Sequence, residues 1–503
     1  MLGLDFRSIK INVVFSKFCI GHQLTLPDAS NGYEIMYKSE QLAHNIRLLI
    51  ENQHLKAHEK LPSLRDQVTA SGLSLMTVMN AYQSLEAQGL IYSKAKSGYF
   101  VSPIAQPQQE AALRSTTVNP PIALNSLIFQ YLKATQSAQL VALGSAFPDH
   151  EVLLSSKLIQ IMAQLTRQKS SYLRAESLPP GNLELRKLIA QRYSMHGIAT
   201  TADDLVISSG CLDALNLSLQ AVAEPGDYIV LQQHIFYGAW QAAERLGLKV
   251  ISLPEHPIYG FDLDAFAEVL ANYPIKVCWL MLNNHNPVGF TVSNEIKAKI
   301  AELIAQHQVY LIEDDVYEEL YVGPQRPLSV KHFDRGHWVL HCSSFSKTLG
   351  NSFRVGWVHA GPFSARIQHL QLMSTISANH LLQQALVEFV SQHHYEKHLR
   401  QVRQTLAKHK KQFFKYLEPR LPAGCEIYYY ASGYFLWIRL PIHVASMQIY
   451  EDLMQQQISV APSSLFCLFA EAQQAIRLNC SFAWNTQIQD ALDQLIHVIE
   501  RYA

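Results

Sequence analysis

Lys347 lies in a short segment whose residue types and spacing point to one chemistry. Ser344 and Ser346 come just before the lysine, and Arg354 and Gly356 follow it in an Arg-x-Gly spacing. A lysine held on a fixed backbone can form a Schiff base with an aldehyde, and nearby hydroxyls and an arginine suit a phosphate group. A lone lysine is usually a solvated charge, but a lysine within this frame of Ser, Thr and Gly is not typical of a surface. The segment therefore indicates a site for a phosphorylated aldehyde.

Two turns earlier in the chain could complete such a site. Ser209, Gly210 and Cys211 come directly before a stretch with helical character, and small residues at a helix start present free backbone N–H groups to a phosphate. Asn286 lies in an Asn-Pro-Val-Gly turn, where its amide could bind a phenolic oxygen. Taken alone, the first turn could equally be a simple helix cap, and the second an ordinary loop.

Two charged residues stand in or directly after apolar runs. Asp314 follows the run 309–312, and a buried carboxylate is costly unless it is paired, for example with a protonated pyridine nitrogen. The alternative is that Asp314 caps the next helix. Arg477 is flanked by apolar residues, and a bidentate carboxylate ligand would satisfy its guanidinium.

The elements that must position these residues alternate in type along the chain after about residue 136. Runs rich in β-branched residues are separated by amphipathic helices, which predicts an α/β fold with a doubly wound, mainly parallel sheet and a smaller α+β subdomain. Because strand ends in such a sheet converge on one crevice, we expect the segments above to meet there. The predicted strands are 205–208, 228–231, 250–253, 277–282, 309–312, 338–342 and 356–360.

Residues 36–102 have a different pattern. Apolar spacing and cap residues predict helices over 41–53, 63–69 and 75–88, and the β-rich runs 90–92 and 98–101 predict a hairpin. This order is that of a winged helix-turn-helix. The proline-rich segment 103–135 reads as a linker before the domain 136–503, and 1–35 as an N-terminal extension, with Met1 and Met36 both open as the start.

The segments within about 136–503 together resemble fold-type I aminotransferases, which bind pyridoxal phosphate. The resemblance implies that Lys347 is the catalytic Schiff-base lysine and that Asp314 pairs with the pyridine nitrogen. It also implies that Asn286 and Tyr317 contact the ring hydroxyl. Arg477 resembles the arginine that grips the α-carboxylate of an amino acid.

The same resemblance implies the contacts to the cofactor's phosphate and ring face. Those to the phosphate are Ser209, Gly210, Cys211, Ser344 and Arg354, with Tyr172 reaching the phosphate of a neighbouring subunit. Phe236 is similar to the aromatic residue that stacks on the ring. The chain has Gln232-Gln233-His234 where Glu-x-Pro is usual, and Val288 is uncommon in its turn, so the stacking residue could be Phe236 or Tyr237.

The N-terminal segments resemble the GntR-type winged helix, and the whole chain resembles a MocR-type regulator. The resemblance implies that Ser63 and Arg65 touch DNA phosphates or base edges. Ser74 and Thr77 would enter the major groove, and Lys96 and Gly98 would lie near the minor groove. Many relatives carry a basic residue where this chain has Leu75. A helical protein-interaction module is the alternative for this segment.

Composition narrows the class of protein. The chain has 503 residues and equal numbers of basic and acidic residues, 41 each, so DNA binding must come from a local patch. Residues 37–101 carry a net charge of only +2, which is modest for a DNA reader and favours binding as a homodimer. The seven cysteines form no CxxC pair, which argues against a zinc site and for a reducing cytoplasm. No membrane span and no metal site are expected.

Three functions remain open at this point. The first is a transcriptional regulator that binds double-stranded DNA and senses pyridoxal phosphate, an amine or an amino acid through an aldimine at Lys347. The second is an active aminotransferase with a DNA-binding appendage, since each residue needed for half-transamination is present. The third, a binding module that forms no aldimine, is disfavoured by Lys347, Asp314 and Arg354. The sequence does not reveal the effector, the operator, or activation versus repression.

Overall fold

A computed structural model describes the chain in two compact units that divide after Gln106. Each unit is considered by itself. The described residues are 38–51, 55–56, 58–87, 89–94, 97–102, 114–117, 128–133, 137, 139–168, 178–256, 260–467 and 474–503.

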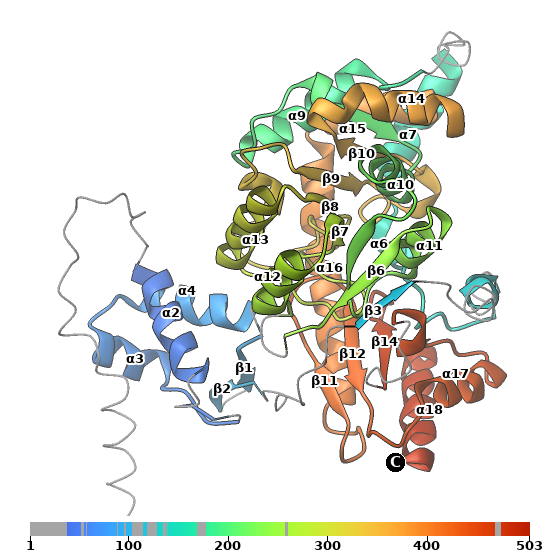
Figure 1. Ribbon diagram of the computed structural model, residues 1–503. Coiled ribbons are helices and arrows are strands. Elements are labelled where there is room, and N and C mark those ends of the chain that lie inside the picture. Colours follow the sequence, from blue (N-terminus) through green and yellow to red (C-terminus); the bar gives the residue numbers. More distant parts are fainter. Residues whose placement is uncertain are drawn as a thin grey trace, which may run out of the picture. The chain divides into compact units, whose positions relative to one another are not determined.

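The described residues of the first unit form three helices and a two-stranded antiparallel hairpin, as the sequence predicts (Figure 1). Ser63 caps α3 by accepting a hydrogen bond from the Asp66 amide at 3.2 Å, and Gly72 ends the helix in the left-handed conformation with φ 66°. Val78 and Tyr82 are among the residues that α4 buries. The elements are α2 (Lys38–Glu51), α3 (Leu64–Ser71), α4 (Leu75–Ala87), β1 (Ile91–Lys94) and β2 (Gly98–Val101).

The predicted linker 103–135 is shorter than the sequence suggested. Within it, strand β3 (Arg114–Thr117) pairs antiparallel with β6 (Lys249–Leu253) at the edge of the large sheet. The helical residues 128–133 place Ile128 and Tyr131 in the core of the second unit. The prediction failed here because β3 is stabilised by pairing with a distant strand, which local composition does not report.

The described residues of the second unit form an eight-stranded sheet in the order β3-β6-β5-β7-β8-β9-β10-β4 (Figure 1). Its central strands from β6 to β9 run parallel, whereas β3, β10 and β4 pair antiparallel at the two edges. The predicted doubly wound fold is therefore confirmed with antiparallel edges. The remaining strands are β4 (Leu205–Ser208), β5 (Tyr228–Gln232), β7 (Ile275–Leu280), β8 (Tyr310–Asp314), β9 (Val339–Ser344) and β10 (Gly356–His359).

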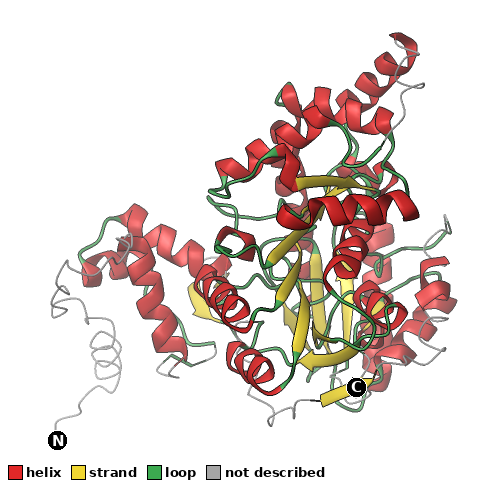
Figure 2. Ribbon diagram, turned by 45° about the horizontal axis from the view of Figure 1, so that its top comes forward, coloured by secondary structure: helices red, strands yellow, loops and turns green. Residues whose placement is uncertain are grey.

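Helices surround this sheet, as Figure 2 shows. Apolar side chains from the sheet and from these helices make up three buried clusters, and the strands β5, β7 and β8 contribute to the two largest. The helices of this part are α6 (His150–Leu153), α7 (Ser156–Gln168), α9 (Leu183–Met195), α10 (Cys211–Val222), α11 (Tyr237–Arg245), α12 (Leu263–Asn272), α13 (Asn294–His307), α14 (Ser364–Ser374) and α15 (His380–Ser391).

The smaller subdomain at the C-terminal end is built on an antiparallel sheet in the order β11-β12-β14-β13. This confirms the predicted α+β part, and it places Arg477 in the interior strand β14. The elements are α16 (His394–Leu417), β11 (Glu426–Tyr428), β12 (Phe435–Arg439), α17 (Ser446–Gln455), β13 (Ala461–Pro462), β14 (Ala475–Asn479) and α18 (Thr486–Tyr502). Among the helices that the structure describes, none combines the length and apolarity needed to cross a bilayer.

Candidate functional site

A small cradle forms where β4 and β9 end and β10 begins. Gly356 on β10 is in register with Ser208 on one side and with Ser344 on the other, and a Cβ at Gly356 would lie 2.7 Å from the Cys211 amide nitrogen. Arg354 has a positive φ of 46° and donates a hydrogen bond to the Ser209 carbonyl at 2.9 Å. The structure thus brings together the residues expected to bind a phosphate.

Gly210 gives this cradle its shape. Its φ of 97° and ψ of 167° lie in a region that only glycine adopts readily, directly before the first turn of α10. A Cβ at this position would stand 2.9 Å from the Arg354 guanidinium. The absence of a side chain therefore lets the guanidinium approach the free N–H groups at the start of α10, and the two together suit an anion.

Lys347 is buried a few residues after β9. Its Nζ donates a hydrogen bond to the Ala146 carbonyl at 2.8 Å, and it lies 4.3 Å from the centre of the Phe147 ring and 5.4 Å from that of Tyr317. Burial, reinforced by the charge of Arg477, lowers the pKa of the Lys347 amine to about 7. A neutral amine is the nucleophilic form, so this lysine is prepared to attack a carbonyl group.

Asp314 ends β8 and is 2% exposed. The Cys211 thiol, which is a weak hydrogen-bond donor, lies 3.7 Å from the Asp314 Oδ1. Burial, with the neighbouring charge of Asp315, raises the pKa of the Asp314 carboxyl to about 7. A carboxyl group in this state gains much from a cationic partner, because such a partner would restore the ionised form. Asp314 caps no helix in the described structure, so the alternative from sequence is not supported.

Arg477 and Asn286 meet although they are far apart in sequence. The Arg477 guanidinium donates hydrogen bonds to the Asn286 side-chain oxygen and to the Gly144 carbonyl. It stacks over the rings of Phe435 and Phe466 at 4.5 and 4.8 Å, and it is 1% exposed. Neutral oxygens therefore satisfy this cation in part, and its Nε has no hydrogen-bond partner within the described residues.

The remaining predicted site residues are placed as follows. Tyr317 follows β8, and its ring packs against those of Tyr434 and Phe435. Phe236 precedes α11 and packs against Tyr237, with 4.5 Å between ring centres, so the choice of a stacking residue between these two stays a prediction. Tyr172 and Lys96 lie outside the described residues.

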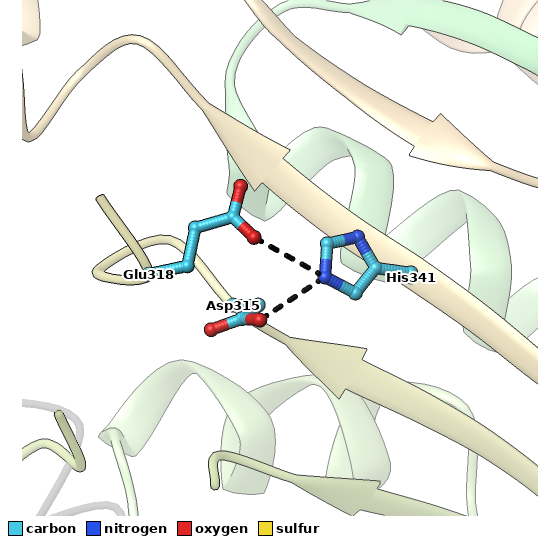
Figure 3. A group of neighbouring side chains, drawn as sticks. All are labelled: Asp315, Glu318 and His341. Atoms are coloured by element: carbon cyan, nitrogen blue, oxygen red, sulfur yellow. Dashed lines mark hydrogen bonds and ion pairs between the residues drawn. The ribbon is translucent and has the colours of Figure 1, made fainter. Parts of the chain in front are cut away.

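A buried set of charged side chains comprises Asp315, the neighbour of Asp314 in sequence, together with Glu318 and His341 (Figure 3). His341 on β9 directs its Nε2 at the Asp315 Oδ2, at 3.1 Å, and at the Glu318 Oε2, at 3.7 Å. Its Nδ1 lies 2.6 Å from the Tyr193 hydroxyl. Although burial opposes the charged form, hydrogen bonding to Asp315 and the charge of Glu318 raise the pKa of His341 above its usual value.

Arginines balance the acidic side of this set. Arg326 forms ion pairs with Glu318 and Glu319, and Arg192 also pairs with Glu319. Within the described residues, the ligand atoms of Asp315, Glu318 and His341 lie within 4.8 Å of one another, the spacing that a metal ion would require. Arg326 and His341 already direct positive charge at these carboxylates, so we interpret the set as a charge-balanced network.

In the first unit, the predicted DNA-contacting residues lie at the starts of α3 and α4 and in the hairpin. Arg65 is exposed in the first turn of α3. Ser74 caps α4, since its hydroxyl accepts a hydrogen bond from the Thr77 amide at 3.2 Å. Gly98 has φ 99°, and a Cβ there would lie 3.5 Å from the Lys60 side chain. The structure leaves the predicted DNA contacts of these residues untested.

Several site residues had no signal in the sequence. Gly144 and Ala146 supply the carbonyls that accept hydrogen bonds from Arg477 and Lys347, across 333 and 201 positions of sequence. A carbonyl group belongs to every residue, so no residue type marks these positions. His341 in the run Val-Leu-His-Cys offered a weak signal, because an ionisable residue in the middle of an apolar strand must find a partner.

Comparison with protein families finds two matches along the chain. Residues 38–101 match the family described as bacterial regulatory proteins, gntR family, and residues 138–495 match aminotransferase class I and II. The Escherichia coli K12 protein named uncharacterized HTH-type transcriptional regulator YdcR is 43% identical over 92% of this chain and 99% of its own length. A second from that bacterium, YjiR, is 31% identical over 93% and 99% of the two chains.

More distant similarity extends to a named regulator and to solved enzymes. The HTH-type transcriptional regulator NorG of Staphylococcus aureus is 24% identical over 88% of this chain and 100% of its own. Kynurenine aminotransferase from Pyrococcus horikoshii superposes with a TM-score of 0.70 at 20% identity, over 79% of this chain and 97% of its own. The α-aminoadipate aminotransferase LysN from Thermus thermophilus superposes with a TM-score of 0.69 at 21% identity, over 75% and 94%. These likenesses show that the second unit has the aminotransferase fold.

Proposed function

Since the chain belongs to the aminotransferase class I and II family and carries a gntR-family domain ahead of that part, we propose that it is a transcriptional regulator that binds double-stranded DNA and senses a small molecule through pyridoxal phosphate. The observation that carries the proposal is the pairing, in one chain, of a helix-turn-helix with a buried lysine, Lys347, in the segment that joins β9 to the cradle residues Arg354 and Gly356.

The residues of the second unit fit pyridoxal phosphate. At the cradle the absence of side chains at Gly210 and Gly356 lets the Arg354 guanidinium and the start of α10 come together, since a Cβ at either glycine would clash with them, and this gives positive charge for a phosphate. Asp314 is a buried carboxylate near the weak donor of the Cys211 thiol at 3.7 Å, and a pyridinium nitrogen is a stronger partner. Lys347 offers a neutral amine between these two ends of the cofactor.

When bound, pyridoxal phosphate supplies an aldehyde for covalent capture of an amine and a ring that withdraws electrons. The chain's own residues set the conditions for this chemistry. Burial lowers the pKa of the Lys347 amine to about 7, so that a large fraction is unprotonated near neutral pH, and the Asp314 carboxylate would hold the ring by its nitrogen. Arg354 and the start of α10 would hold the phosphate.

The effector that this site fits best is an amino acid. Arg477 directs a buried guanidinium into the same site, where its present partners are the neutral oxygens of Asn286 and Gly144. A carboxylate would replace these oxygens with a charge-assisted, bidentate pair. The amino group of the same molecule would then compete with Lys347 for the cofactor.

The proposed regulator acts as a homodimer in the cytoplasm. Two winged helices on one dimer would read two half-sites, and this doubles the small positive charge that each first unit offers to DNA. Large apolar side chains exposed on the second unit could bury surface between subunits, among them Leu154, Ile159, Leu178 and Leu183. Sedimentation of the full chain at micromolar concentration tests for twice the monomer mass.

The function is tested by combining DNA selection with effector titration. The full chain with pyridoxal phosphate is used to enrich a random duplex library, and affinity for the enriched site is then measured with and without each amino acid. We expect one or a few amino acids to change DNA affinity by at least fivefold while the formation of keto acid stays negligible. When a second keto acid is supplied as the amino-group acceptor, formation of keto acid from the amino acid over many turnovers, with DNA affinity unchanged, would instead establish an aminotransferase.

Arg477→Gln should separate carboxylate recognition from cofactor binding. The variant keeps a polar side chain that can still reach Asn286, but it loses the charge that a carboxylate requires. Because a hydrogen bond to a charged group contributes about 1.5–3 kcal/mol, we expect the half-saturating amino acid concentration to rise by roughly 10- to 100-fold. The matching decarboxylated amine should act equally on both proteins. An equal loss for amino acid and amine would mean that Arg477 does not read the carboxylate.

A further inference from the structure

Helix α4 presents a face without charge where a DNA-reading helix usually carries basic residues. Its buried side, which includes Val78 and Tyr82, packs into the first unit. The opposite side displays Met76, Asn80 and Gln83 at positions i, i+4 and i+7, and all three are exposed. The one charged residue of α4 is Glu86, which lies in its last turn. Recognition by this helix therefore cannot rest on lysine or arginine.

The apolar side chains of this face, Leu75 and Met76, are exposed to solvent. Leu75 is 53% exposed and Met76 is 60% exposed, although they occupy the first turn of the helix, immediately after the cap at Ser74. Leaving two large apolar side chains in water forfeits the gain that burial would give. In helix-turn-helix proteins the N-terminal residues of the second helix contact base edges. An apolar side chain in that place can contact the 5-methyl group of thymine.

The polar part of the face is suited to the partner base. Within the described part of the chain, the side chains of Asn80 and Gln83 make no hydrogen bond, so both amides are available to a ligand. Asn and Gln can bind adenine with two hydrogen bonds, to N6 and N7 in the major groove, whereas guanine prefers Arg or Lys. The apolar and amide residues of α4 thus favour the same base pair.

We propose that α4 reads A·T base pairs, with Leu75 and Met76 contacting thymine methyl groups and Asn80 and Gln83 binding adenine. This inference rests on the proposed DNA-binding function and specifies its operator class. Residues outside α4 supply the positive charge for the phosphates, with Arg65 exposed in the first turn of α3. The half-site is therefore A·T-rich in the major groove contacted by α4.

The test starts from the duplexes enriched by the full chain with pyridoxal phosphate. Each thymine of the enriched half-site is replaced in turn by deoxyuridine, which removes only the methyl group. One or two thymines should each lose about three- to fivefold in affinity, the value of roughly one buried methyl group. Met76→Ala and Leu75→Ala should each weaken the binding of unmodified DNA. For each variant, replacing the thymine that its side chain contacts with deoxyuridine should cause no further loss of affinity.

Further variants test the amides and the specificity. Asn80→Ala should lose about 10-fold or more in affinity and should relax selection at one adenine. Leu75→Arg should shift the selected base at its position toward guanine. The matched control is Ile442→Ala in the second unit, where the side chain is 89% exposed, and its selected site should equal that of the unaltered chain.

The outcomes distinguish the proposed DNA-binding function from the proposed base preference of α4. If no sequence is enriched at all, the proposed DNA-binding function fails. If a site is enriched but is G·C-rich, or is indifferent to deoxyuridine and to Leu75 and Met76, then the function stands and the reading of α4 is overturned. A change in solution mass on mutating Leu75 and Met76, with the DNA preference intact, would assign this face to a protein contact and would also overturn it.

Discussion

Lys347→Ala protein that is mixed with pyridoxal phosphate and treated with borohydride should carry no covalently attached cofactor, whereas the unaltered chain should carry one per subunit. Lys347 is a buried amine that interacts with the charges of Asp314 and of Arg354 in the cradle, and alanine supplies no nucleophile in its place. Intact-protein mass and the absorption band of the bound cofactor give two independent readouts. A chain that keeps its adduct on a different residue would contradict the site assigned here.

The matched control is Lys410→Met. Lys410 on α16 is also fully buried, and burial lowers the pKa of its amine to about 7, as it does for Lys347. Its Nζ donates a hydrogen bond to the Ser432 carbonyl at 2.7 Å, and Ser432 is not part of the cradle. The control variant should therefore keep the adduct on Lys347. Partial and equal loss of the adduct in the two variants would mean that both lysines are modified. Burial and reactivity, rather than the cradle, would then decide where the cofactor attaches.

Arg326→Met should destabilise the second unit by about 3–5 kcal/mol, the cost of breaking a buried ion pair. Arg326 pairs with Glu318 and Glu319, and these carboxylates are 6% and 11% exposed. Burial opposes ionisation of Glu319, but Arg326 and Arg192 hold its pKa at about 2. Urea unfolding of the two proteins at neutral pH measures the difference.

The pH dependence of this difference identifies its cause. A carboxyl group with a lowered pKa contributes stability above its unfolded value, 4.5 for Glu319, and that stability is lost as the pH falls toward about 2. The gap between the variant and the unaltered chain should therefore narrow as the pH falls, because Glu318 and Glu319 take up protons at a higher pH once Arg326 is removed. Lys187→Met, which removes an exposed pair with Glu184, should change stability by no more than about 0.5 kcal/mol. A gap that is constant with pH would point to lost packing rather than lost charge.

The sequence predicts most of the framework and the chemical groups of the site. Seven strands of the large sheet were predicted to within a few residues, because each is a β-branched run bounded by turns. Lys347 could be predicted from the Ser, Thr, Gly and Arg residues around it, and Asp314 because a carboxylate after an apolar run is costly unless it is paired. The winged helix followed from caps such as Ser63 and Ser74, whose hydrogen bonds are local.

What the sequence could not supply depends on contacts across long separations. Strand β3 forms only because β6 offers it an edge, and the composition of 103–135 is that of a linker. The network of His341, Asp315 and Tyr193 joins three elements, and no spacing along the chain relates them. No sequence pattern marks a backbone carbonyl, although those of Ala146 and Gly144 accept hydrogen bonds from Lys347 and Arg477.

Those two carbonyls couple ligand occupancy to the position of a single strap, residues 141–147. The strap is held by Lys347 at Ala146, by Arg477 at Gly144 and by Asn479, which donates to the Phe147 carbonyl at 2.7 Å. A cofactor that engages Lys347, or a carboxylate that engages Arg477, takes a donor away from this strap. By thermodynamic linkage, anything that pulls the strap away from these donors must strengthen ligand binding to the same degree that ligand binding frees the strap.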